Sequence, residues 1–175
     1  MSLVYKPDWE ETRQRLRQWW NHEYFGRCAL SVTAPLDNPP DQPAPPAPQT
    51  LEDQWYDLDA IAARNDYGMS RTFYGGEAIP IWSAGYPGIA SLATMLGCPF
   101  RLDMHTGWHD PIFTDPDGFD IRSLRLDEHH DAYRYHFDVL RRAMRESAGK
   151  SFPSMGAFYH AGDLLDAIRR SEEHT

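Results

Sequence analysis

LDEHHDAYRYHFDVLRRAMRESAGK, residues 126–150, is the clearest helix of the sequence, and SFPSMGAFYH, residues 151–160, follows it as an expected buried strand. Apolar residues of the helix recur at intervals of four, three and four: Tyr133, Phe137, Leu140 and Met144. Charged residues cover its other face, and Gly149 ends it. Because helices that alternate with strands are typical of α/β proteins, this stretch favours an α/β fold.

The rest of the sequence alternates in the same way. The expected elements are a helix over 7–26, a strand over 27–34, a helix over 51–72, a short helix over 87–98, a hairpin within 100–114, and a helix from residue 161 onward. Seven prolines within residues 35–49 predict an extended surface loop at 35–50. The order of these elements predicts a parallel α/β layout in a single domain that spans residues 1–175.

Charge and composition exclude several classes of partner. The chain carries 17 basic and 26 acidic side chains, a net charge of −9, so nucleic acid and anionic membranes are not expected partners. The start of the sequence is too polar for a signal peptide, so no leader is expected, and no apolar run approaches the ~20 residues that span a bilayer. Cys28 and Cys98 form no CxxC motif, which predicts a reducing, cytoplasmic setting with both thiols buried and unbridged.

The stretch RTFYGGEAIPIWSAGYPG, residues 71–88, contains the best single acid–base candidate. Glu77 follows two glycines and is expected beside Tyr74 and Trp82. Aromatic walls raise the pKa of a carboxyl group by desolvation, which suits a general acid or base. The alternative is a surface glutamate beside a turn.

Two further groups of residues have both a functional and a structural interpretation. His105 and His109 are four residues apart and could meet across the expected hairpin, but no HExxH motif is present, and satisfied or exposed histidines are the default. No Ser–His–Asp arrangement is indicated. Asp163 follows the last expected strand, where it could cap the next helix or point into a site at the end of that strand.

Four patches resemble the N-terminal part of the uroporphyrinogen decarboxylase-like superfamily, in its divergent branch. They are WWNHEYFGRCALSVTAP (19–35), FYGGEAIPIW (73–82), GYPGIASLATMLGC (85–98) and MGAFYHAGDLLDAIR (155–169). Members are (β/α)8 TIM barrels that decarboxylate a tetrapyrrole, as lyases, or transfer methyl groups to or from corrinoids and thiols. A complete barrel takes ~250 residues. The resemblance therefore implies an incomplete barrel: roughly the first three β/α units, with an inserted hairpin.

The resemblance also implies which residues face the mouth of the barrel. The set consists of Glu77 and Asp163 as catalytic candidates and Tyr74, Trp82, His105, Trp108, Tyr159 and His160 as ligand-binding candidates. In a full-length relative, Glu77→Gln is then expected to lower turnover much more than stability. Zinc or a corrinoid is the cofactor expected in full-length relatives, with none bound by this chain alone.

Two departures from the superfamily pattern affect the expected function. The arginine-rich RQAGR signature of the haem-pathway enzyme is missing and only Arg27 lies near its place, which argues against decarboxylation of a tetrapyrrole. The zinc ligands of the methyltransferases belong to the later half of the barrel. We therefore expect a truncated enzyme fragment that is inactive alone. The alternatives are a stand-alone small-molecule binding module and a non-catalytic domain that forms homo-oligomers through exposed sheet edges.

Overall fold

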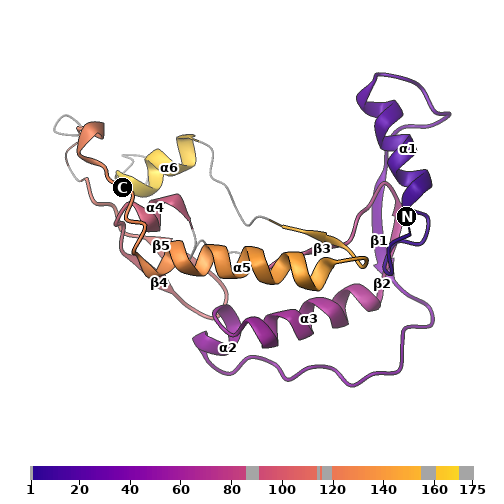
Figure 1. The fold of residues 1–175 in the computed structure, drawn as a ribbon, viewed down its shortest axis with the longest axis horizontal. Coiled ribbons are helices and arrows are strands. Elements are labelled where there is room, and N and C mark those ends of the chain that lie inside the picture. Colours follow the sequence, from indigo (N-terminus) through magenta and orange to yellow (C-terminus); the bar gives the residue numbers. More distant parts are fainter. Residues whose placement is uncertain (1, 86–90, 114, 116–119, 155–160, 170–175) are drawn as a thin grey trace.

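The computed structural model describes residues 2–85, 91–113, 115, 120–154 and 161–169, which form an elongated arrangement of helices and small sheets (Figure 1). Within these ranges the elements are α1 Trp9–Trp20, β1 Ser31–Pro35, α2 Leu51–Trp55, α3 Leu58–Ser70, β2 Thr72–Gly76, β3 Ile81–Trp82, α4 Leu92–Met95, β4 Phe100–Leu102, β5 Gly107–His109, the 3₁₀ turn η1 Ile121–Ser123, α5 Asp131–Ser147, β6 Phe152–Pro153 and α6 Ala161–Ile168. The strands pair as β1–β2, β3–β6 and β4–β5. This mixture of helices and small sheets is compatible with the α/β class, and the described strands form no closed barrel.

The N-terminal unit of α1, β1 and β2 departs from the expected parallel layout. β1 pairs with β2 in antiparallel register, with Ser31 opposite Gly76 and Pro35 opposite Thr72. The strand expected over 27–34 therefore does not begin a parallel sheet, and that expectation is wrong. Alternation of residue types indicates a strand but does not specify the direction in which it pairs, and here β2 returns along β1 after a long excursion.

That excursion contains the proline-rich loop and two helices. Residues 36–50 contain no helix or strand and run below α3 in Figure 1. The helix expected over 51–72 is split into α2 and α3. Asp57 causes the break because its side chain accepts hydrogen bonds from the amides of Asp59 and Ala60, at 2.9 and 3.0 Å, and so begins a new helix.

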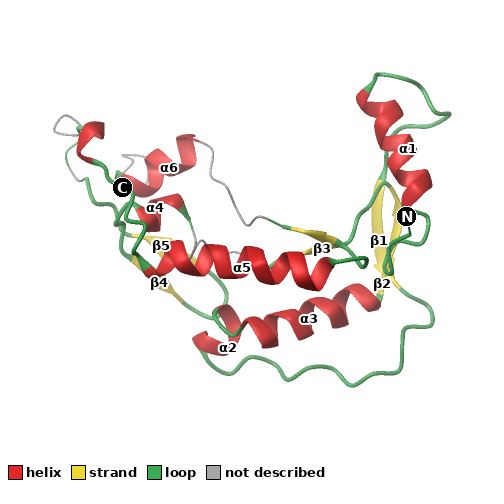
Figure 2. Cartoon of the chain, in the orientation of Figure 1, coloured by secondary structure: helices red, strands yellow, loops and turns green. Residues whose placement is uncertain are grey.

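β3 and β6 are the parallel pair among the described strands. The amides of Phe152 and Ser154 donate to the carbonyls of Pro80 and Trp82, at 2.9 and 2.8 Å. α3 and α5 lie side by side and pack against this pair (Figures 1 and 2). Trp82 is 1% exposed between them. The core cluster consists of Ile61, Ala62, Met69, Trp82, Val139 and Ala143.

The buried face of α5 is not the predicted apolar stripe. The buried residues of this helix are Ala132, Val139, Ala143 and Ser147. Small side chains let the helix approach the strands closely. In the predicted stripe, by contrast, Phe137 is 39% and Met144 is 67% exposed. Tyr133 and Leu140 of the stripe are half-buried, so the stripe forms a partly uncovered flank of the helix.

The far end of the molecule holds a second, smaller core and the hairpin. Ala93, Cys98 and Ile168 are buried together where α4 meets α6. The predicted hairpin is confirmed, with Phe100 opposite His109 and Leu102 opposite Gly107. Of the two thiols, Cys98 is buried as expected but Cys28 is exposed, and both are free. Among the described residues, no helix has both the length and the apolar character that crossing a bilayer requires.

Candidate functional site

Glu77 lies in an ion-pair network between α1 and the end of β2. Arg27 donates two hydrogen bonds to its carboxylate, Nη1 to Oε2 and Nη2 to Oε1, both at 2.7 Å. Arg15 Nε donates to Oε1 at 2.7 Å, and the amide of Leu30 donates to Oε2 at 2.8 Å. The side chain of Glu77 is 4% exposed. Because a carboxylate has about four acceptor positions, these bonds fill its capacity.

The expectation that the pKa of Glu77 is raised is wrong. The hydrogen bonds from Arg27 lower its pKa most, burial opposes them, and the Leu30 amide and Arg15 lower it further, to about 2. The two arginines lower the pKa of Glu77 by more than desolvation raises it. A carboxylate that is ionised at every ordinary pH and already fully bonded is poorly suited to move protons.

The backbone carbonyl of Gly76, the residue before Glu77, accepts hydrogen bonds from side chains of α1 and of the segment before it. It accepts hydrogen bonds from Lys6 Nζ at 2.9 Å, Thr12 Oγ1 at 3.1 Å and Arg15 Nη2 at 3.4 Å. Lys6 Nζ also donates to the carbonyl of Tyr74 at 2.7 Å, and its side chain is 0% exposed. These contacts fasten α1 to the end of β2, so the network has a structural role.

The place of Glu77 in the fold agrees with this role. Glu77 precedes β3, so it lies at the amino end of that strand. Sites of (β/α)8 enzymes lie at the carboxyl ends of the strands. The structure therefore does not put Glu77 where the resemblance implied, at the mouth of a barrel.

Tyr74 and Trp82 belong to the core around the β3–β6 pair. Tyr74 packs against the cluster that contains Trp82, and burial raises the pKa of its phenol. In the part of the chain that the structure describes, Nε1 of Trp82 is buried without a hydrogen-bond partner. Neither ring lines the pocket described next.

The described residues form a pocket of about 700 Å³, which Tyr135 and Trp55 connect to the segment that follows β3. A Cβ on Gly85, three residues after β3, would lie 3.5 Å from the Trp55 ring, and the Trp55 carbonyl accepts a hydrogen bond from the hydroxyl of Tyr135. The pocket lies between the start of α5, the α4–β4 connection and the α2–α3 break. Its lining consists of Tyr56, Thr94, Gly97, Cys98, Pro99, Phe100, His130, Asp131, Ala132, Arg134, Tyr135 and Asp138.

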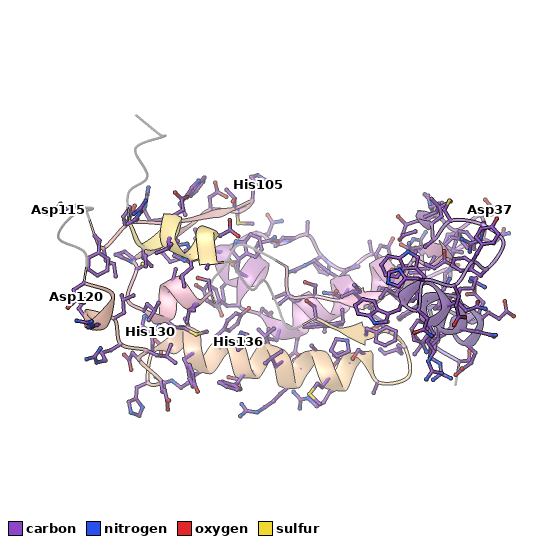
Figure 3. The ribbon with its side chains drawn as sticks, turned by 90° about the horizontal axis from the view of Figure 1, so that it is seen from above. Asp37, His105, Asp115, Asp120, His130 and His136 are labelled. Carbon is purple, nitrogen blue, oxygen red and sulfur yellow. The ribbon has the colours of Figure 1, made fainter. Side chains whose placement is uncertain are left out.

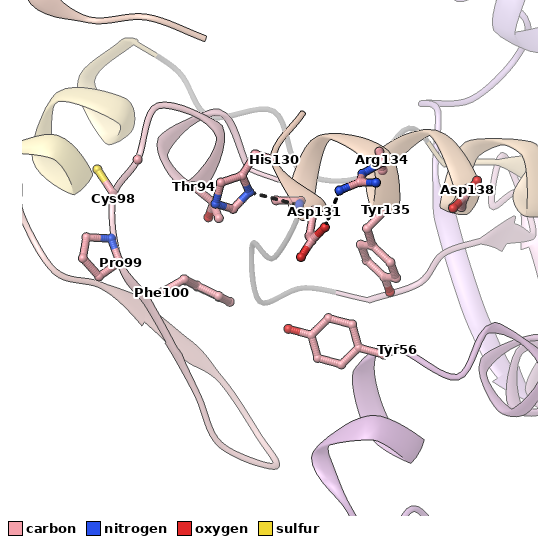
Figure 4. Close-up of a pocket in the computed structure, with 12 residues that line it drawn as sticks. Tyr56, Thr94, Cys98, Pro99, Phe100, His130, Asp131, Arg134, Tyr135 and Asp138 are labelled. Carbon is pink, nitrogen blue, oxygen red and sulfur yellow. Dashed lines mark hydrogen bonds and ion pairs between the residues drawn. The ribbon is translucent and has the colours of Figure 1, made fainter. Parts of the chain in front are cut away.

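Aromatic rings line this pocket together with three charged side chains, those of Asp131, Arg134 and Asp138, each of which is held in an ion pair (Figure 4). The rings of Tyr56 and Tyr135 are 5.5 Å apart, and burial raises the pKa of both phenols, which are therefore neutral at physiological pH. His130 caps α5 by accepting the amide of Ala132 at Nδ1, 3.1 Å away. Asp131 and Arg134 form an ion pair at 2.8 Å. The site is suited to a flat ligand of low charge.

The histidines of the hairpin do not meet. His105 is exposed in the turn of the hairpin, and in Figure 3 it lies between Asp115 near one end of the molecule and Asp37 at the other. His109 lies in β5, with its ring centroid 4.7 Å from that of Phe100. Trp108, between them, is 49% exposed. The hairpin therefore does not join these residues into one site.

His109 instead contacts two hydroxyl groups at α4. Its Nε2 lies 2.9 Å from Oγ of Ser91 and 2.9 Å from Oγ1 of Thr94, and burial lowers its pKa. No sequence motif indicates this Ser–His contact, because the two residues are 18 positions apart. Ser91 is 2% exposed and caps α4 by accepting the amide of Thr94, so the group stabilises this turn.

Asp163 is exposed in the first turn of α6, which begins at Ala161. The choice between a cap and a residue that points into a site stays a prediction for Asp163. Tyr159 and His160 lie outside the described residues. No local sequence pattern indicates the pocket, because Tyr56 and Tyr135 are far apart in sequence and histidine is not among the usual capping residues.

The described residues contain no group of three or more His, Cys, Asp or Glu side chains arranged to hold a metal ion. Comparisons of the chain with models of protein families, with curated proteins and with solved structures found no match. The proposals below therefore rest on the residues themselves.

Proposed function

We propose that the chain is the N-terminal part of a (β/α)8-barrel enzyme of the uroporphyrinogen decarboxylase-like superfamily, inactive alone. In this proposal β3 and β6 are the first two strands of the barrel, and α5 is the helix between them. The chain supplies part of a small-molecule site at the carboxyl ends of these strands. The observation that carries the proposal is the parallel β3–α5–β6 unit, the repeating element of such barrels.

The free edge of β3 supports this proposal. Pro80 and Trp82 bond to β6, so the peptide groups of Ile81 face the opposite edge, where the described residues contribute no strand. Asn65 occupies the adjacent position by exchanging two hydrogen bonds with the backbone of Ser83, at 2.8 and 3.0 Å. The Ile81 side chain is 48% exposed. A further strand would pair with this edge of β3 and cover the side chain of Ile81.

The exposed flank of α5 supports the proposed barrel in the same way. On one flank α5 contacts the neighbouring helix, where Arg142 pairs with Asp59 of α3. The predicted stripe lies on the opposite flank, and its members Phe137 and Met144 are exposed. In a barrel each helix lies between two others, so this flank would receive the helix of another unit.

Between the two reactions of the superfamily, we favour methyl transfer over decarboxylation of a tetrapyrrole. Carboxylate groups of a substrate need free cationic groups. Arg15 and Arg27 are both bound to Glu77, and Arg134 in the pocket is bound to Asp131. A corrinoid or a thiol substrate does not have this requirement. Zinc or a corrinoid cofactor would be held by the completed barrel, because the described residues do not fit a zinc centre.

A second candidate function is a stand-alone small-molecule binding module. The aromatic pocket favours it, because a volume of about 700 Å³ is in the range of ligand sites. Both candidates place the ligand at the same residues. They differ in whether the chain needs further strands.

The pocket can be tested by titrating the chain with hydroxocobalamin and with coproporphyrin, a tetracarboxylate, while tryptophan fluorescence is recorded. We expect weak binding of the corrinoid and about tenfold weaker binding of the porphyrin, because no free cation meets its carboxylates. Tyr56→Ala is expected to weaken corrinoid binding by about tenfold through loss of an aromatic wall.

Phe137→Ala is the matched control, because it removes an exposed ring outside the pocket. It is expected to leave binding unchanged. Tighter binding of the porphyrin would overturn the preference for methyl transfer. No response to either ligand, or equal losses in the two variants, would overturn the pocket as the site.

A further inference from the structure

Beyond Trp9, which packs against Phe152 of β6, the outward face of α1 is largely exposed within the described chain. Thr12 is the buried residue of this helix, whereas Trp20 at its C-terminal end is 76% exposed. A groove of about 790 Å³ runs along this face, lined by Trp9, Leu16, Arg17 and Trp20 among others. Large exposed apolar groups, tryptophan above all, are typical of binding surfaces.

The accessible area of the chain leaves room for such an interface. The chain exposes 11603 Å². A compact chain of 20.2 kDa exposes about 8,800 Å². The excess of about 2,800 Å² per chain also includes the β3 edge and the α5 flank, and it exceeds the ~800 Å² that each partner buries in a standard interface.

The charge pattern of α1 identifies a fitting occupant. Its first turn carries Glu10, which pairs with Arg13 of the same helix, and Glu11, and its later part carries Arg17. Two copies of the helix packed in antiparallel orientation bring the acidic end of one against the basic end of the other, and their helix dipoles also oppose. About a two-fold axis the same contact forms twice, which is the arrangement of most dimers.

We propose that a second copy of this chain docks on the groove of α1, with the two α1 helices antiparallel. Trp20 of each copy is the apolar anchor, and Glu10 of each copy lies against Arg17 of the other. Arg15 takes no part, because it points to Glu77. This interface is separate from the β3 edge, so it does not depend on the proposed barrel.

The first test is sedimentation velocity of the chain and of two tryptophan variants over a range of concentrations. We expect the unaltered chain to dimerise and Trp20→Glu to be monomeric, with dissociation at least about a hundredfold easier. Trp108→Glu is the matched control, because it alters another half-exposed tryptophan at the far end of the molecule. It is expected to dimerise like the unaltered chain.

The second test exchanges the charges across the interface. Arg17→Glu alone and Glu10→Arg alone each place like charges in both contacts, so each variant is expected to be monomeric. An equal mixture of the two variants restores both opposite-charge contacts and is expected to form a heterodimer.

Circular dichroism shows whether each variant is folded. The mixture remains informative even though each variant alone is expected to be monomeric, because a heterodimer requires only two folded monomers. A monomeric unaltered chain, a Trp20→Glu variant that dimerises normally, or a mixture that stays monomeric would each overturn the proposal. A dimer that is lost on Ile81→Lys but not on Trp20→Glu would assign the contact to the sheet edge instead.

Discussion

Glu77→Gln is expected to lower the free energy of unfolding by about 3 kcal/mol. The substitution keeps the shape of the side chain but removes its charge, which leaves Arg15 and Arg27 without their anion in a site where the carboxylate is 4% exposed. Breaking a buried pair by removing one partner is strongly destabilising, by ~3–5 kcal/mol. This reverses the expectation from the sequence, which gave the residue a larger effect on turnover than on stability. Urea denaturation followed by circular dichroism measures the change.

Asp110→Asn is the matched control, because Asp110 pairs with Arg101 while the two side chains are 44% and 67% exposed, outside both the pocket and the proposed dimer interface. Its effect is expected to be below ~0.5 kcal/mol. The pH dependence gives a second readout. Because folding lowers the pKa of Glu77 from 4.5 to about 2, its contribution to stability is complete above pH 4.5 and is lost as the pH falls toward 2. A Glu77→Gln variant as stable as the unaltered protein at pH 7 would refute the structural role.

Gly76→Ala is expected to have the largest effect, a loss of about 4 kcal/mol of stability or failure to fold. Gly76 has φ +59°, and a Cβ on it would lie 2.1 Å from the carbonyl oxygen of Leu30, which is backbone and cannot rotate away. The shift would also break the bonds that Lys6 and Thr12 make to the Gly76 carbonyl. Thermal unfolding is the measurement.

Gly149→Ala separates the clash from the backbone conformation. Gly149 also has a positive φ, +70°, but nothing lies within 4 Å of a Cβ placed there. Its replacement is expected to cost only ~1–2 kcal/mol for the left-handed conformation. If the two alanine variants were equally stable, the close approach of Leu30 to Gly76 would be refuted.

Local signals in the sequence predicted individual elements well. The helix α5 and the β4–β5 hairpin follow from the apolar spacing and the turn residues of their own segments. The break at Asp57 needed the side chain's capping bonds, which compete with a continuous helix. The direction of β1 depends on a partner strand 37 residues farther along the chain, between Pro35 and Thr72, so no local pattern could give it.

The candidate site was less predictable, because long-range partners determine the chemistry of each group. Glu77 has aromatic neighbours in sequence, yet its pKa is lowered by Arg15 and Arg27, which lie 62 and 50 residues away. The apolar spacing of α5 was evident, but which flank is buried depends on the strands beneath it. The aromatic pocket likewise combines Tyr56 with Tyr135, and only the fold brings them together.

Amide hydrogen exchange at Ile81 tests the proposed barrel most directly. In the chain alone, the amides of Phe152 and Ser154 should be protected by their bonds to β3, whereas the Ile81 amide at the open edge should exchange freely. In a protein extended by the coding sequence that follows the Thr175 codon, a further strand should protect Ile81 by at least about a hundredfold. An Ile81 amide that stays unprotected in the longer protein, or one already protected in the chain alone, would contradict the proposed barrel.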